Sequence, residues 1–110
     1  KGFGKLPNLT GAAEGDYLTD HLTKETNALI RKFKNDPFFI VLSHYAVHVP
    51  LQAKPHLVAK YVREREKLPH VDRSALDSGA YYRTSQDNAV YAAMVESVDE
   101  SVCRVPRQLL

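Results

Sequence analysis

Two histidines, His44 and His48, stand at the end of the apolar run PFFIVLSHYAVHVPLQ (37–52). A near-neutral imidazole can donate a hydrogen bond to an anionic oxygen and can transfer a proton. In open α/β sheets, ligands gather beyond the carboxyl ends of strands, which is where these two rings would lie. The pattern therefore predicts a site for an anionic group. A surface or structurally bonded imidazole is the alternative interpretation of a bare histidine in a loop.

Other chemistries fit these residue types less well. The four-residue spacing of His44 and His48 is that of a helical zinc pair, but HExxH would need Glu where Tyr45 stands. Ser43 precedes His44 without the G-x-S-x-G elbow of a hydrolase. Cys103 falls in an apolar helical pattern, which favours a structural role over a nucleophilic one. We expect no metal site in this chain.

The composition is that of a globular chain with one domain or part of one. It has 110 residues, 44% of them hydrophobic and 25% charged, and a net charge of +2. Basic and acidic residues alternate in Arg63-Glu64-Arg65-Glu66-Lys67, which is typical of a solvated helix rather than a nucleic-acid surface. No apolar run approaches the length of a membrane span, and no signal peptide opens the chain. We expect neither nucleic acid nor membrane as a partner.

The first half of the chain predicts a loop, a helix and a strand. Residues 1–16 are rich in glycine and predict a loop, and 17–34 predict a helix that Asp16 or Thr19 caps. The apolar stripe of this helix consists of Leu18, Leu22, Ala28, Leu29 and Phe33. The segment 38–43 (FFIVLS) is continuously apolar and predicts a strand buried on both faces, followed by a histidine loop at 44–54.

The second half predicts two more helices. Residues 55–67 begin with Pro55 at a first-turn position, and 87–105 begin at Asp87 or Asn88 as cap. Between them, 68–86 show no clean period and predict a long loop, which can carry part of a substrate specificity.

The expected fold is an α/β fragment, mostly helical, with about three helices and one main strand. A strand that is apolar on both faces needs neighbours for its backbone N–H and C=O groups. The chain supplies no other clear strand, so the strand belongs to a larger mixed sheet that self-association completes. We therefore expect a homo-oligomer, most simply a dimer.

Three blocks of the sequence resemble the type I sulfatases, arylsulfatase-like enzymes of the alkaline-phosphatase-like superfamily. The central block is Pro37–Gln52, similar to the family's PFF strand and VH-x-PLQ loop. The flanking blocks, YLTD at 17–20 and YAAMVESVDESV at 91–102, stand in the same order as in the family. Together the blocks cover about residues 16–104.

The resemblance implies the hydrolysis of sulfate esters of small molecules or glycans. Family enzymes use a formylglycine nucleophile, made from the Cys or Ser of a C/S-x-P-x-R motif, and a calcium ion held by Asp and Asn. By resemblance, His48 matches the histidine that contacts the sulfate near the leaving-group oxygen. His44 has no firm counterpart and is placed at the pocket rim or behind the contacting groups. Family members are often periplasmic, secreted or lysosomal, and the location of this chain stays open.

The chain departs from the family pattern in its catalytic motifs. No C/S-x-P-x-R is present, because CRVPR at 103–107 places proline one position too late. The Asp and Asn metal motifs of the family are also missing, and Cys103 stands where the family usually has a small residue. We therefore expect residues 1–110 to form a single partial sulfatase-like domain that is inactive alone, with no cofactor of its own. The alternative is a self-associating binding or assembly protein that reuses a sulfatase-derived segment.

Overall fold

Three helices make up most of the structure, a computed structural model that describes residues 11, 13, 15–69 and 74–109. The elements are α1 (Leu18–Phe33), α2 (Pro55–Glu66), β1 (Ser74–Asp77), β2 (Ala80–Arg83), α3 (Ala89–Arg104) and a 3₁₀ turn, η1 (Pro106–Gln108). The two strands pair in an antiparallel hairpin. The expectation of a mostly helical α/β chain with three helices is confirmed. None of the helices in the described ranges is long and apolar enough to cross a bilayer.

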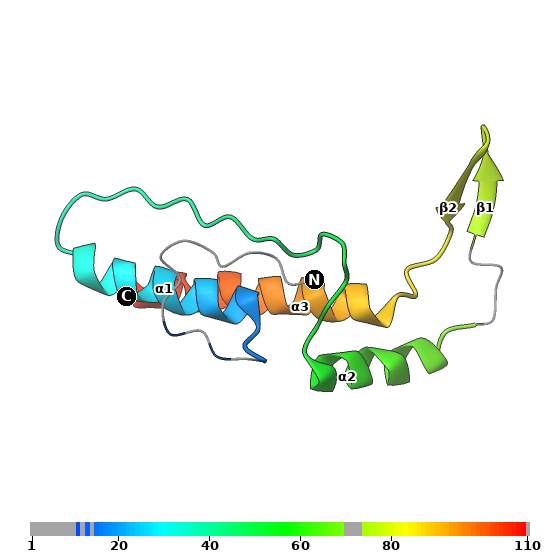
Figure 1. Cartoon of the computed structure of the whole chain (residues 1–110), viewed down its shortest axis with the longest axis horizontal. Helices are drawn as coiled ribbons and strands as arrows, with labels where there is room; N and C mark the ends of the chain where they lie inside the picture. The colour runs from blue at the N-terminus through cyan, green and yellow to red at the C-terminus, as the bar shows by residue number, and fades with distance from the viewer. Residues whose placement is uncertain (1–10, 12, 14, 70–73, 110) are drawn as a thin grey trace.

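Helix α3 is the centre of the arrangement, because it packs against both α1 and α2 (Figure 1). Its buried face is built from small or flexible side chains: Ala89, Ala93, Met94, Ser97 and Ser101. Ala93 and Ser97 are completely buried. Small side chains let neighbouring backbones approach closely, so α3 can pack against both α1 and α2.

The buried face of α1 differs from the predicted apolar stripe. The buried residues are Thr19, His21, Thr23, Thr26 and Ile30, whereas Leu29 is 43% exposed and Phe33 38%. The reason is a polar seam with α3, in which the hydroxyls of Thr23 and Ser101 lie 2.5 Å apart. The predicted apolar stripe is therefore not the face that α1 buries.

The start of α1 also differs from the prediction that Asp16 or Thr19 caps it. Tyr17 is the N-cap residue, and its side chain makes no capping hydrogen bond. The Asp16 carboxylate instead accepts a hydrogen bond from the backbone N–H of Ala13, at 2.8 Å. Thr19 lies buried inside the first turn. The carboxylate is thus used in the loop before the helix rather than at the helix end.

The predicted strand at 38–43 is extended but belongs to no sheet in the described part of the chain. It is also largely exposed rather than buried, and the segment runs from α1 to α2 as a long crossing (Figure 1). A strand is stable only where neighbouring strands take up its backbone hydrogen bonds, and no described strand lies beside this segment.

The only sheet in the described residues lies where a long loop was predicted, within 68–86. Ser74 pairs with Arg83 and Asp77 with Ala80, and Ser78-Gly79 form a two-residue turn with positive φ at both positions. Such a turn matches the twist of the flanking strands. The strands have only four residues each and are mostly exposed, so no periodic burial signalled them.

Candidate functional site

The predicted site residues lie on the segment 44–54, which joins the extended crossing to α2. A tight turn shapes its first part, since the backbone N–H of His48 donates to the carbonyl of Tyr45 at 2.9 Å. The turn separates the two imidazoles, and no hydrogen bond joins them in the structure as described. His44 is half-buried and His48 is exposed.

The ring of His48 is held by its own backbone. Nδ1 lies 2.8 Å from the carbonyl oxygen of Val49. A carbonyl oxygen can only accept, so Nδ1 carries the proton and donates it to this bond. The neutral ring then presents the lone pair of Nε2, and the protonated ring presents an N–H. His48 can therefore take a proton, or donate a charge-assisted hydrogen bond to an anionic oxygen.

The ring of His44 is in the opposite situation. Both of its nitrogen atoms are buried, and neither has a hydrogen-bond partner in the structure. Buried polar atoms without partners cost free energy, because they lose their hydrogen bonds to water. His44 is therefore not anchored by hydrogen bonds in the described part of the chain, whereas His48 is.

The end of the histidine loop is fixed to all three helices. The hydroxyl of Tyr17, just before α1, donates to the carbonyl of Gln52 at 3.2 Å. Lys54, the N-cap residue of α2, places its ammonium 3.2 Å from Asp20 on α1 and 2.8 Å from Glu100 on α3. These contacts position the segment that carries His48 relative to the helices.

Lys54 is the residue that sequence reasoning missed at this site. Its side chain is only 13% exposed. Burial alone would lower the pKa of Lys54, but its hydrogen bonds to Glu100 and Asp20 outweigh burial and hold the pKa above the ordinary value. The ammonium thus stays charged and works as a positioning group. A lysine two residues after PLQ and directly before the helix-starting Pro55 was the available signal.

The side chains needed for a metal centre are not gathered in the described part of the chain. No group of three His, Cys, Asp or Glu residues lies close enough together there to hold an ion. Cys103 is exposed rather than packed in an apolar stripe, which corrects the structural role expected for it. It stands near the end of α3, away from the histidine loop in sequence.

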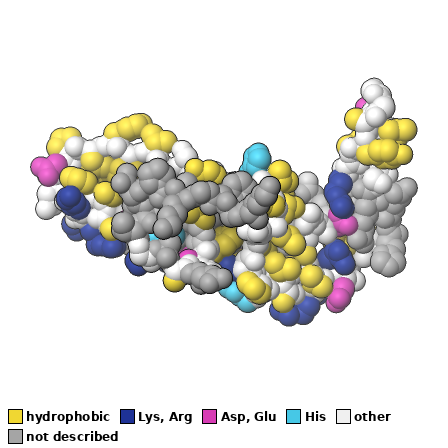
Figure 2. Space-filling view, viewed as in Figure 1, with side chains coloured by type: hydrophobic (Ala, Val, Ile, Leu, Met, Phe, Trp, Pro, Cys, Tyr) yellow, Lys and Arg dark blue, Asp and Glu magenta, His cyan; other side chains and the backbone are white. Residues whose placement is uncertain are grey.

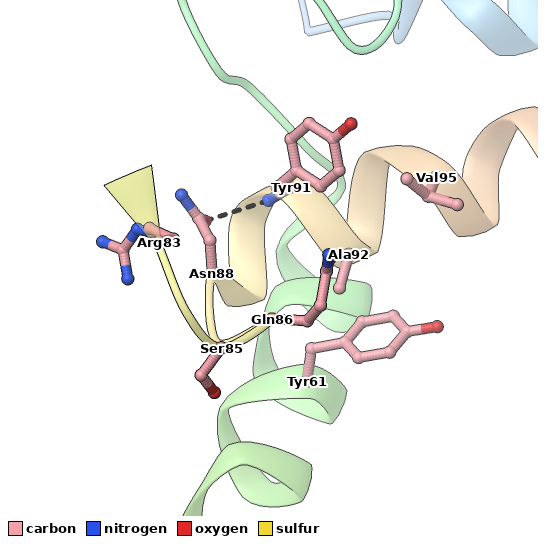
Figure 3. Close-up of a pocket in the computed structure, with 8 residues that line it drawn as sticks. All are labelled: Tyr61, Arg83, Ser85, Gln86, Asn88, Tyr91, Ala92 and Val95. Carbon is pink, nitrogen blue, oxygen red and sulfur yellow. Dashed lines mark hydrogen bonds between the residues drawn. The ribbon is translucent and has the colours of Figure 1, made fainter. Parts of the chain in front are cut away.

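A cavity of about 440 Å³ opens beside α2 and the start of α3. Figure 3 shows its lining side chains, and the polar ones are Tyr61, Arg83, Ser85, Gln86, Asn88 and Tyr91. Burial and a hydrogen bond to Glu96 raise the pKa of Tyr61, so its phenol stays protonated. Aromatic rings with amide and guanidinium donors can bind a polar ring-shaped molecule. The cavity lies partly in 68–86, the segment expected to carry part of a specificity.

Comparison with known proteins agrees with the three sequence blocks. A family model described as "Sulfatase" matches residues 3–110, which is nearly the whole chain. No curated protein matches the sequence of the chain. The match includes the histidine loop, the anchoring residues around Lys54 and all three helices. The chain therefore belongs to the sulfatase family.

Proposed function

We propose that this chain forms one wall of a sulfate-ester pocket, with His48 as the group that contacts the sulfate near the leaving-group oxygen. The observation that carries the proposal is the ring geometry of His48. Its Nδ1 is committed to the Val49 carbonyl, so Nε2 is the atom left for a ligand. Membership of the sulfatase family supplies the chemical class of that ligand.

In this proposal the protonated ring acts through its positive charge and through the orientation of its Nε2–H group. The Nε2–H of His48 donates to a sulfate oxygen or to the bridging ester oxygen, where negative charge develops as the S–O bond breaks. In an intact family enzyme, where a nucleophile outside this chain would form the new bond to sulfur, the Nε2 proton can go to the leaving alkoxide, which departs as the alcohol. The hydrogen bond from Nδ1–H to the Val49 carbonyl fixes the ring plane, which removes part of the entropy cost of aiming the Nε2–H donor.

His44 has a supporting place in the proposal. Both of its ring nitrogens are buried and unpartnered, so a ligand or a neighbouring polypeptide that supplies an acceptor would gain a hydrogen bond there. We therefore assign His44 to the rim of the pocket or to the layer behind the contacting groups, and not to the chemical step.

We further propose that the chain alone does not turn over a sulfate ester. The 110 residues contain no C/S-x-P-x-R motif, so they supply no formylglycine. The described part also brings no three His, Cys, Asp or Glu residues together to hold a calcium ion. Both groups belong to the intact family enzyme, whose substrate is a sulfated small molecule or glycan. Loss of nucleophile and metal together removes the reaction, whereas the binding wall with His48 remains.

The test is a titration of the chain with a sulfated sugar, followed through the NMR signals of the histidine rings. We expect the His48 ring signals to shift in the wild-type chain, and the affinity for the sugar, followed through the backbone amide signals of residues 45–52, to fall in His48→Gln. His56→Gln is the matched control, because His56 is an exposed histidine on α2. Equal binding by His48→Gln would contradict the assignment. Hydrolysis of a chromogenic aryl sulfate that disappears in His48→Ala would contradict the proposed inactivity.

The second candidate function is a self-associating binding or assembly protein that reuses a sulfatase-derived segment. The exposed apolar crossing at 38–43 favours it, because such a surface is suited to contact with another polypeptide. The mass of the intact protein and the coding sequence upstream discriminate the two. A C/S-x-P-x-R motif upstream in the same frame favours the sulfatase wall, whereas a natural start and stop at these ends favours the assembly protein.

A further inference from the structure

We propose that the cavity beside α2 and the start of α3 binds one uncharged sugar unit of a glycan. Two tyrosine rings form the apolar part of this site, and a guanidinium and two side-chain amides form its polar part. The side chains concerned are Tyr61, Tyr91, Arg83, Gln86 and Asn88. The proposal rests on the proposed function only for the class of ligand, a sulfated glycan. The binding itself involves no residue of the histidine loop.

The walls of the cavity come from one continuous part of the chain. Lys54 precedes α2 and contacts Glu100. Lys60 lies further along α2 and contacts Glu96, which comes earlier in α3, so the two helices run antiparallel. The segment 83–88, which leads from β2 into α3, supplies the third side (Figure 3). The volume of about 440 Å³ lies within the range of small-molecule sites, about 300–1,000 Å³, so a single sugar ring fits.

The apolar part of the cavity consists of two tyrosine rings from different helices. Figure 3 shows Tyr61 on α2 and Tyr91 on the first turn of α3. The hydroxyl of Tyr61 is hydrogen-bonded to Glu96, so this residue offers the cavity its ring rather than its hydroxyl. The faces of a sugar ring carry C–H groups, and these gain free energy when they leave water for an aromatic surface. The two tyrosines therefore suit a ring-shaped ligand.

The polar part of the cavity is held in place by bonds within the protein. Nη1 of Arg83 donates to the carboxylate of Asp87. Oδ1 of Asn88 accepts from the first backbone amides of α3, so its NH₂ group is the half left for a ligand. The other guanidinium N–H groups and the amide of Gln86 add donors and one acceptor. Sugar hydroxyls both donate and accept, and side chains that are already held lose less entropy when they bind them.

The charges around the cavity favour an uncharged ligand. Among the described residues that line it, only Arg83 is charged, and Asp87 offsets that charge. An anion would approach a guanidinium that already holds a carboxylate, and a cation would meet the guanidinium itself. On the face that Figure 2 shows, the Lys and Arg side chains around the end of α2 alternate with Asp and Glu side chains and form no continuous patch. The cavity thus differs from His48, which suits the anionic group.

Helix α2 connects the cavity with the histidine loop. Its first residue, Pro55, follows the loop directly, and Tyr61 lies about 9 Å further along the helix axis. A glycan that places its sulfate at His48 and extends along α2 brings a further unit toward the cavity. Such a unit adds affinity without contact to the sulfate, so the cavity selects sulfated glycans over sulfated small molecules.

The experiment is an NMR titration of the whole chain with methyl glucoside and methyl galactoside, which are uncharged, and with glucuronate, which adds a carboxylate to the same ring. We expect the backbone amide signals of 83–92 to shift with the uncharged sugars. Tyr91→Ala should weaken this binding about tenfold, whereas Tyr91→Phe keeps the ring and most of the affinity. Tyr81→Ala is the matched control, because Tyr81 is an exposed tyrosine on β2 and does not line the cavity.

Three results would overturn the proposal. The first is the absence of shifts at 83–92 with both uncharged sugars. The second is tighter binding of glucuronate than of methyl glucoside, which would make the cavity an anion site. The third is an equal loss of affinity in Tyr81→Ala and Tyr91→Ala, with helices that circular dichroism shows to be intact. Methyl glucoside should bind His48→Gln as it binds the wild type, so a failure here is distinguishable from a failure of the function proposed for His48.

Discussion

The ammonium of Lys54 lies 2.8 Å from a carboxylate oxygen of Glu100, so the end of the histidine loop is tied to the last part of α3. The same ammonium reaches Asp20 on α1 at 3.2 Å, and Arg104 approaches both acids at 3.3 and 3.8 Å. One side chain thus contacts acids on α1 and α3 from the start of α2. This network of ion pairs fixes the end of the loop that carries His48.

Replacement of Lys54 should therefore loosen the whole arrangement. Lys54→Met keeps the length of the side chain and removes its charge, which leaves Asp20 and Glu100 without their shared partner. We expect the free energy of unfolding to fall by about 1–3 kcal/mol. Chemical denaturation followed by circular dichroism measures it. Lys60→Met is the control, because the Lys60–Glu96 pair lies at the surface, and an equal loss there would contradict the argument.

The same lysine gives the stability a pH dependence at the alkaline end. Its hydrogen bonds hold the pKa of Lys54 above the ordinary lysine value in the folded chain. A group with a raised folded pKa contributes its stability fully below the unfolded pKa and loses it as the pH rises through the folded pKa. Thermal midpoints should therefore fall above the ordinary lysine pKa, more steeply in wild type than in Lys54→Met. Parallel curves would contradict this.

The buried face of α3 predicts a strong dependence on side-chain size at Ser97. This residue is completely buried, and its hydroxyl donates only to the Ala93 carbonyl of its own helix. Ser97→Leu has no room and should cost about 1–3 kcal/mol of unfolding free energy through overpacking. Ser97→Ala keeps the close approach and should be nearly neutral. If both variants unfold at the same denaturant concentration, the face is not tightly packed.

The start of α3 depends on one side chain. Asn88 accepts hydrogen bonds from the backbone N–H groups of Val90 and Tyr91, both at 3.0 Å, as the sequence predicted for one of two candidates. Asn88→Ala should lower the free energy of unfolding by about 1 kcal/mol, because two amides at the helix end lose their acceptor. Asn88→Asp retains an acceptor and should lose little. Urea titrations of both variants test the difference.

The helices were predictable because their periodic patterns and end signals are local. Pro55 and Asn88 mark their helix starts in the sequence as they do in the structure. The face of α1 was not predictable in the same way. The leucines of α1 predicted which face of the helix is buried. Thr23 is buried instead, where its hydroxyl donates a hydrogen bond to the hydroxyl of Ser101, 78 residues away in the sequence. A hydrophobic period identifies an apolar stripe and not which neighbour is present to cover it.

In the candidate site, too, some features depend on neighbouring residues of the sequence and others on residues far away in it. The turn around His48 is formed by residues that are close together in the sequence. The residue types there predicted an imidazole that binds an anionic group. The anchoring of the loop by Lys54 needs Asp20 and Glu100, which lie 34 and 46 residues away, and no local pattern joins them. The predicted strand at 38–43 is the clearest case, since its apolar run predicted burial, whereas the segment is largely exposed and joins no sheet in the described part of the chain.

Calcium should not stabilise this chain. The acids nearest the histidine loop, Asp20 and Glu100, are already occupied by Lys54 and Arg104. The described part of the chain brings no three potential ligands together, whereas calcium needs six to eight oxygens. An ion that binds only the folded state raises the unfolding midpoint as its concentration exceeds the dissociation constant. We therefore expect thermal midpoints in calcium chloride and in magnesium chloride of equal ionic strength to coincide. A rise specific to calcium, abolished in Glu100→Gln, would show that the acids around Lys54 can rearrange into a binding site.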